Sequence, residues 1–134
     1  MTKTITAYIS TLIVFAAIDA IWLTQVGPSL YKPVLGDLLA PQPRFGAAVI
    51  FYLIFIAGIV YFAVLPGLTA GWTQALVKGA VLGFVAYATY DLTNQATLAV
   101  WSTKLTLADM AWGTFLTGLS AAGGCLITGW FFKG

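Results

Sequence analysis

Residues 45–66 read FGAAVIFYLIFIAGIVYFAVLP, a run of 22 residues without a charged side chain. A bilayer hydrocarbon core about 30 Å thick needs about 20 residues of α-helix to cross it. Residues 5–26, 74–98 and 106–132 form three more segments of sufficient length and apolar character. Because the second and third connections are short, consecutive segments should run antiparallel. The sequence therefore predicts an all-α fold, an antiparallel bundle of four transmembrane helices in one domain, 1–134.

The composition agrees with a membrane location. Only 7% of the 134 residues are charged and 60% are hydrophobic, whereas soluble domains are about a quarter charged. We therefore expect membrane lipids to cover most of the surface. The net charge of +2 is small and scattered, so no nucleic-acid partner is expected. With one cysteine, Cys125, and no histidine, no metal site or cofactor is expected either.

Glycine and proline mark the expected helix ends. Gly27-Pro28 should end the first helix and Pro66-Gly67 the second. The proline-rich loop 27–44 contains an amphipathic stretch, residues 29–40. This stretch is either a short interfacial helix over one end of the bundle or an ordered connector around the helix ends. Thr106 is the expected N-cap of the fourth helix, three residues before Asp109.

Three of the four acidic residues, Asp19, Asp91 and Asp109, lie inside hydrophobic segments. A charge in hydrocarbon costs a few kcal/mol or more, so an intramembrane acid is a candidate functional residue. Following the chain up and down the bundle places Asp19 and Asp91 each about 10 Å from a helix end, and Asp109 about 4.5 Å from one. All three approach the end that carries the long loop, whichever way the bundle points.

Tryptophan accompanies two of these acids. Asp19 and Trp22 are three residues apart, as are Asp109 and Trp112, so each pair shares a helix face and the indole N–H can donate to a carboxylate. The repeat is typical of a paired structural device. The alternatives are an interfacial aromatic belt for the tryptophans and a helix-capping role for Asp109 in the first turn.

The third segment presents a polar stripe. Tyr87, Asp91 and Asn94 are spaced i, i+4 and i+7 on one helix face, and Tyr90 lies beside them. Asp19 and Asp91 are either functional or buried acids that tie helices together by hydrogen bonds. Those bonds are worth about 0.6 kcal/mol each in membranes, which does not obviously offset the cost of ionisation, so we favour a functional role.

Small residues indicate where helices pack closely. Gly79 and Gly83 are four residues apart in the third segment, and the fourth segment is rich in glycine and alanine. Such spacing lets helix backbones approach each other in lipid. The pattern predicts close packing of the third and fourth helices, either within one chain or between two copies in a homo-oligomer.

The segment Tyr87-Ala-Thr-Tyr-Asp-Leu-Thr-Asn-Gln-Ala-Thr-Leu98, with Phe51-Tyr52 and the two D-x-x-W pairs, resembles a family of short bacterial membrane proteins known as domain of unknown function 2177. The resemblance covers nearly the whole chain and implies a four-helix protein of the inner membrane, without implying an activity. The family motif falls on Tyr90, Asp91, Leu92, Thr93, Asn94, Ala96 and Thr97.

Orientation is poorly determined, because three cationic residues lie at each end of the predicted bundle. One end carries Lys3, Lys78 and Lys133, and the other carries Lys32, Arg44 and Lys104. The amino terminus and the long loop favour cytoplasmic termini.

Three functions remain open. The first is binding or transport of a small amphipathic molecule or lipid at an intramembrane site near one membrane face. The second is a structural or accessory subunit, and the third is a lipid-modifying enzyme in which Asp19 and Asp91 serve as acid and base. We rank them in that order. The candidate ligand-binding residues are Asp19, Asp91, Asn94, Tyr87, Tyr90, Trp22, Trp112 and Asp109.

Overall fold

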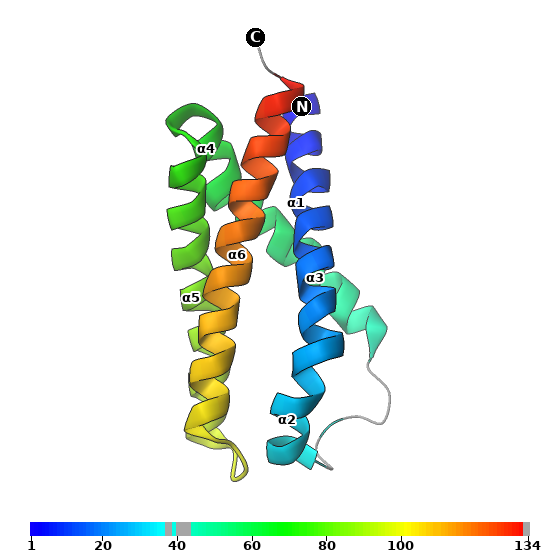
Figure 1. The fold of residues 1–134 in the computed structure, drawn as a ribbon, viewed down its shortest axis with the longest axis vertical. Coiled ribbons are helices and arrows are strands. Elements are labelled where there is room, and N and C mark those ends of the chain that lie inside the picture. Colours follow the sequence, from blue (N-terminus) through cyan, green and yellow to red (C-terminus); the bar gives the residue numbers. More distant parts are fainter. Residues whose placement is uncertain (37–38, 40–43, 133–134) are drawn as a thin grey trace.

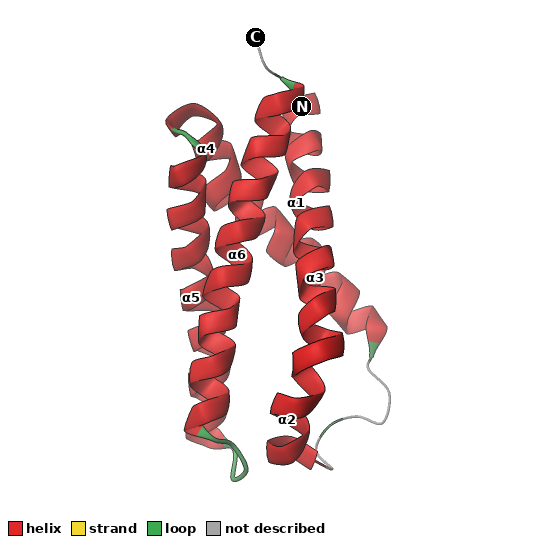
Figure 2. Cartoon of the chain, in the orientation of Figure 1, coloured by secondary structure: helices red, strands yellow, loops and turns green. Residues whose placement is uncertain are grey.

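The computed structural model describes residues 1–36, 39 and 44–132, and the regular structure within them is helical (Figure 2). Four helices are long and apolar enough to span a membrane: Thr2–Leu35, Phe45–Ala70, Trp72–Thr97 and Thr103–Phe131. They alternate in direction, so that the start of the first helix and the end of the fourth lie at one end and the turn between α5 and α6 lies at the other (Figure 1). The predicted all-α bundle of four spanning helices is confirmed.

The first spanning helix continues past its proline. Helix α1 (Thr2–Ile21) passes through a π-helical turn (Trp22–Val26) directly into α2 (Gly27–Leu35). The prediction that Gly27-Pro28 ends this helix is therefore wrong. Residues 29–35 of the amphipathic stretch form the end of this helix and not a separate interfacial one. Residues 37, 38 and 40 of that stretch lie outside the described residues.

The second spanning helix behaves in the same way. Helix α3 (Phe45–Ile59) passes through a π-helical turn (Val60–Val64) into α4 (Leu65–Ala70). The predicted end at Pro66-Gly67 is also wrong, because the helix continues to Gly71, whose φ of 115° suits glycine.

Proline explains both π-helical turns. Its ring lacks an N–H and clashes with the carbonyl four residues earlier, which strains a regular α-helix. Each π-helical turn comes just before a proline, and the widened turn moves the hydrogen bond to the carbonyl five residues back. Gly27 N–H donates to the Trp22 carbonyl, and Leu65 N–H donates to the Val60 carbonyl. Inside lipid the backbone must stay hydrogen-bonded, so such local adjustment is favoured over a break.

Helices α5 (Trp72–Thr97) and α6 (Thr103–Phe131) form a hairpin with a short turn. The N-cap of α6 is Ser102, whose Oγ accepts a 3.1 Å hydrogen bond from the Leu105 N–H. The predicted N-cap, Thr106, lies inside the helix instead. Asp109 is therefore six residues into α6, and its predicted capping role in the first turn is wrong.

The turn between α5 and α6 is fixed by side-chain hydrogen bonds. The Thr106 hydroxyl donates to Gln95 Oε1 at 2.7 Å and accepts from Trp101 Nε1 at 2.8 Å. Gln95 Nε2 donates to the Thr103 hydroxyl at 3.0 Å. These bonds join the last turn of α5 to the first turn of α6, so the two helices hold a fixed register at this end.

Glycines let α5 and α6 approach closely. A Cβ on Gly83 would overlap the Thr117 side chain, and a Cβ on Gly79 would meet the Ala121 Cβ at 2.6 Å. Both glycines are covered by α6 of the same chain, which supports the packing alternative within one chain. A homo-oligomer through Gly79 and Gly83 stays a prediction.

The core lies where α3 crosses the other spanning helices. Phe15 of α1, Ile56 and Ile59 of α3, and Leu116 of α6 are buried there. Figure 1 shows α3 running obliquely behind the other helices and diverging from α5 and α6 toward the end that carries α2. The candidate site lies at this end.

Candidate ligand-binding site

The three intramembrane acids are all buried, with exposed fractions of 8% for Asp19, 0% for Asp91 and 4% for Asp109. Asp91 is six residues before the end of α5 and Asp109 is six residues after the start of α6. At 1.5 Å per residue each lies about 9 Å from the same end of the hairpin. The Asp109 carboxyl is thus deeper than its predicted place near the helix end.

Asp19 joins three spanning helices. The Tyr52 hydroxyl of α3 donates to Asp19 Oδ2, and Trp112 Nε1 of α6 donates to Asp19 Oδ1 at 3.4 Å. Both carboxyl oxygens of this α1 residue therefore accept a hydrogen bond from a neutral donor on another helix. Such bonds satisfy a buried carboxyl without supplying a positive charge.

Asp109 is reached from the end of the first spanning helix. The Tyr31 hydroxyl of α2 donates to Asp109 Oδ1, and Trp22 Nε1 donates to the Tyr31 hydroxyl at 3.1 Å. The rings of Trp22 and Trp112 stack, with centroids 4.4 Å apart and an interplanar angle of 12°.

The tryptophan of each D-x-x-W pair is therefore linked to the aspartate of the other pair and not to its own. Each indole was expected to reach a carboxylate, and Trp112 does so, but the carboxylate is Asp19 of α1 and not Asp109 of its own helix. Trp22 reaches Asp109 only through the Tyr31 hydroxyl. The stacked rings and crossed bonds agree with the paired structural device predicted from the repeat.

Asp91 is the most enclosed of the three acids. Its carboxyl lies beside the Asp109 carboxyl of the neighbouring helix. Within the described part of the chain, no N–H or O–H donor bonds to either Asp91 oxygen. Among the described residues its polar neighbour is another carboxyl, and two buried carboxyls side by side share one proton more readily than both ionise.

A pocket of about 930 Å³ lies beside these acids. Its wall comes from α1, the π-helical turn that follows it, and α2, α3, α5 and α6. The lining residues are Asp19, Trp22, Leu23, Tyr31, Phe45, Ala48, Val49, Phe51, Tyr52, Ala86, Tyr87, Tyr90, Asp109 and Trp112. Apart from Tyr52, the α3 side of the wall is apolar, and its side chains at positions 45, 48, 49 and 51 are exposed. The opposite side holds two carboxyls and several phenol and indole groups.

A model of a protein family described as "Predicted membrane protein (DUF2177)" matches residues 4–126. The chain belongs to this family. No curated protein and no solved structure matches it. Membership in DUF2177 agrees with the four spanning helices, and the chemistry of the site is read from its residues.

Only part of segment 87–98, which carries the DUF2177 resemblance, lines the pocket. Tyr87 and Tyr90 line it, whereas Asp91 and Asn94 do not. Asp91 lies behind the pocket wall, against Asp109. Of the eight predicted site residues, the structure thus gathers six around the pocket: Asp19, Trp22, Tyr87, Tyr90, Asp109 and Trp112.

Sequence reasoning missed Tyr31 and Tyr52, the phenols that donate to Asp109 and Asp19. A signal was available, because a tyrosine inside a hydrophobic span usually finds a hydrogen-bond partner for its hydroxyl. The pattern of residues 29–40 placed Tyr31 among apolar residues, and Tyr52 lies within a long uncharged run.

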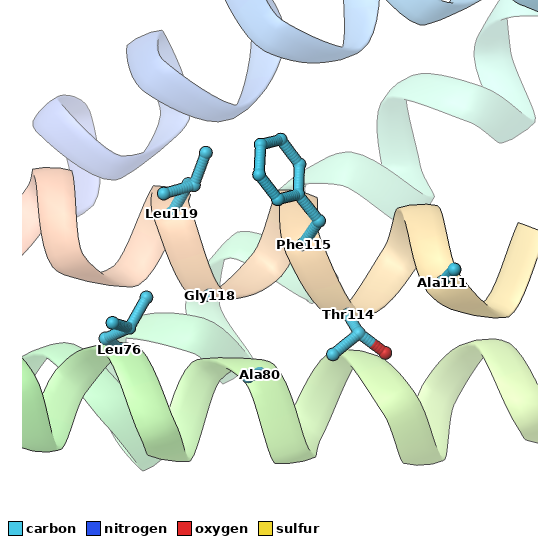
Figure 3. A pocket seen from close by; sticks show the side chains of 7 residues that line it. All are labelled: Leu76, Ala80, Ala111, Thr114, Phe115, Gly118 and Leu119. Carbon is cyan, nitrogen blue, oxygen red and sulfur yellow. The ribbon is translucent and has the colours of Figure 1, made fainter.

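A second hollow lies on the outside of the α5–α6 hairpin in this DUF2177 protein. It measures about 410 Å³ and is lined by Leu76, Ala80, Ala111, Thr114, Phe115, Gly118 and Leu119 (Figure 3). The Thr114 hydroxyl donates to the Met110 carbonyl at 2.8 Å. This groove has no charged lining residue, which makes it a useful comparison for the larger pocket.

Proposed function

We propose that the protein binds or transports a small amphipathic molecule, held within the membrane in the pocket between α1, α3, α5 and α6. The observation that carries this proposal is the pocket of about 930 Å³ that combines an apolar wall with two hydrogen-bonded carboxyls, Asp19 and Asp109. Ligand sites typically measure about 300–1,000 Å³ and are apolar with a few convergent polar groups.

The distribution of exposed residues supports entry from lipid. Phe45, Val49 and Phe51 line the pocket on the α3 side and are 69%, 54% and 50% exposed in the isolated chain. In a bilayer these side chains face acyl chains. A ligand tail would therefore lie along α3 while its polar head reaches Asp19 and Asp109.

The structural or accessory role retains support from the hydrogen bonds themselves. Tyr52 to Asp19 ties α3 to α1, and Tyr31 to Asp109 ties α2 to α6. Hydrogen bonds that only hold helices together, however, do not require a pocket of about 930 Å³ beside them. We therefore rank binding above the accessory role.

The enzymatic alternative draws less support. In the enzymatic hypothesis Asp19 and Asp91 serve as acid and base, but Asp91 is fully buried and does not line the pocket. A general acid or base must come within hydrogen-bonding distance of the substrate. A substrate in this pocket would meet Asp19 and Asp109 instead.

Filling the pocket tests the proposal. Ala48 lines the pocket and Ala111 lines the outer groove, and both are exposed alanines. Wild type, Ala48→Trp and Ala111→Trp would be purified in a neutral detergent after incubation with a membrane extract, and co-purified small molecules quantified by mass spectrometry. We expect Ala48→Trp to lose about 90% of a bound species, a tenfold change, and Ala111→Trp to retain it. Identical co-purified species at equal amounts in all three proteins would contradict the proposal.

A further inference from the structure

We propose that the pocket selects a cationic amphiphile, a molecule with an ammonium or similar positive head on an apolar tail. This inference rests on the proposed function and adds the charge of the ligand. It is carried by three features of the described residues: the carboxyls that line the pocket, the pairing of one of them with Asp91 behind the wall, and the aromatic rings of the lining.

The charged groups that line the pocket have one sign. Asp19 and Asp109 line it, and the lining residues that the structure describes include no lysine or arginine. The groups that bond to these carboxyls are the hydroxyls of Tyr31 and Tyr52 and the indole of Trp112, all of which are neutral. The hydrogen-bonding needs of the acids are therefore met in part, while no positive charge balances them.

Asp91 and Asp109 form a buried pair of carboxyls. Asp91 is 0% exposed, its carboxyl lies beside that of Asp109, and no N–H or hydroxyl of the described residues bonds to it. Two such carboxyls in a medium of low dielectric constant do not both ionise without a nearby cation. A cationic head at Asp109 would lower the cost of ionisation by placing a positive charge next to the pair.

The aromatic rings complement the same kind of head. The stacked indoles of Trp22 and Trp112 and the phenols of Tyr87 and Tyr90 line the pocket around the carboxyls. Cations are attracted to aromatic faces, and protein sites for quaternary ammonium groups are typically built from such rings.

The same features disfavour other ligands. An anionic head, such as that of a fatty acid or an acidic phospholipid, would face two carboxyls, and the juxtaposition of like charges is strongly unfavourable. A bare metal ion is also a poor match, because no three acids, cysteines or histidines within the described ranges are grouped to hold one. A neutral amphiphile would bring no positive charge to the carboxyl pair.

Three probes with the same tail and different heads test the inference: decyltrimethylammonium, decanol and decanesulfonate. Each would be titrated calorimetrically into the wild-type protein in phosphatidylcholine nanodiscs, with empty nanodiscs as the reference for partitioning. We expect saturable binding of the ammonium probe with a Kd at least about tenfold lower than that of decanol, and no saturable binding of the sulfonate.

Two variants then test whether the carboxyl of Asp109 causes the preference for a cationic head. Asp109→Asn should weaken binding of the ammonium probe by about tenfold and weaken binding of decanol by less, so that the preference for the ammonium head falls. Lys104→Gln, which alters an exposed charge in the first turn of α6, should change neither. The comparison of heads on the wild-type protein remains decisive if Asp109→Asn fails to fold.

The two proposals fail in different ways. If ammonium and alcohol probes bind equally well, or the sulfonate binds best, the inference about charge is overturned while binding in the pocket stands. If no probe binds saturably, the inference is also overturned, and the extract experiment with Ala48→Trp decides the proposed function independently.

Discussion

Tyr87 shows how a single contact shapes the pocket wall. Its ring packs against Gly113 of α6, and a Cβ at position 113 would overlap ring atoms. Because a side chain larger than hydrogen cannot be accommodated there, Gly113 sets the position of the Tyr87 ring at the pocket. This contact therefore helps to set the spacing between α5 and α6 beside the pocket.

Gly113→Ala should displace the Tyr87 ring and destabilise the protein by about 1–3 kcal/mol, the usual cost of overpacking. Gly129→Ala is the matched control on the same helix, because nothing lies within 4 Å of its added Cβ, and replacing a helical glycine by alanine is favourable by about 1 kcal/mol. Thermal unfolding of both variants checks the difference. Equal stability of the two would contradict the packing described for Tyr87.

The site residues could be predicted from the sequence only in part. Asp19 and Asp109 stand out because acids are rare in hydrophobic segments. Their phenol donors do not, since Tyr31 and Tyr52 are separated from their partners by 78 and 33 positions. Which tyrosine meets which acid depends on helix rotation and tilt, and a single sequence does not encode these locally.

At the scale of helices, the number and type of elements follow from hydrophobic length, whereas their ends do not. Prolines at positions 28 and 66 suggested helix ends, but lipid favours a continuous hydrogen-bonded backbone and the chain responds with π-helical turns. The consequence for the site is direct. Continuation of the first helix into α2 brings Tyr31 to Asp109.

Adding one residue to the first π-helical turn tests this consequence. The widened turn already accommodates one extra residue, so an alanine inserted after Gln25, which is exposed, should rotate Tyr31 by about 100° around the helix axis. Tyr31 would then face away from Asp109, and retention of the extract ligand should fall.

Tyr31→Phe is the milder comparison, because it removes only the hydroxyl. We expect the amount of co-purified ligand to decrease in the order wild type, Tyr31→Phe, alanine insertion after Gln25. An insertion variant that retains as much ligand as wild type would show that the position of α2 does not matter for binding.

For the whole molecule, the decisive feature is that the pocket lies toward the end opposite to the termini. The start of α1 and the end of α6 are at one end, and the α5–α6 turn, near which Asp91 and Asp109 lie, is at the other (Figure 1). The orientation of the bundle therefore determines which side of the membrane the site faces. Cationic residues do not settle this, because the sequence has three at each end.

We propose that the termini are cytoplasmic in a bacterial inner membrane, which places the pocket toward the periplasmic face. Cys125 is buried, so Cys125→Ser gives a background into which Lys3→Cys or Lys104→Cys is introduced at an exposed position near each end. A membrane-impermeant maleimide added to intact cells with a permeabilised outer membrane should label Lys104→Cys at once and Lys3→Cys only after lysis.

The labelling result also bears on how the ligand arrives. If Lys104→Cys is the accessible position, an amphiphile entering from the periplasmic leaflet reaches Asp109 after passing only the exposed α3 side of the pocket, lined by Phe45 and Val49. The opposite result, with Lys3→Cys labelled in intact cells, would invert the bundle and make the cytoplasmic leaflet the source of the ligand. Labelling of both positions from outside would contradict a single orientation with three membrane crossings between residues 3 and 104, and would point to two orientations in the membrane.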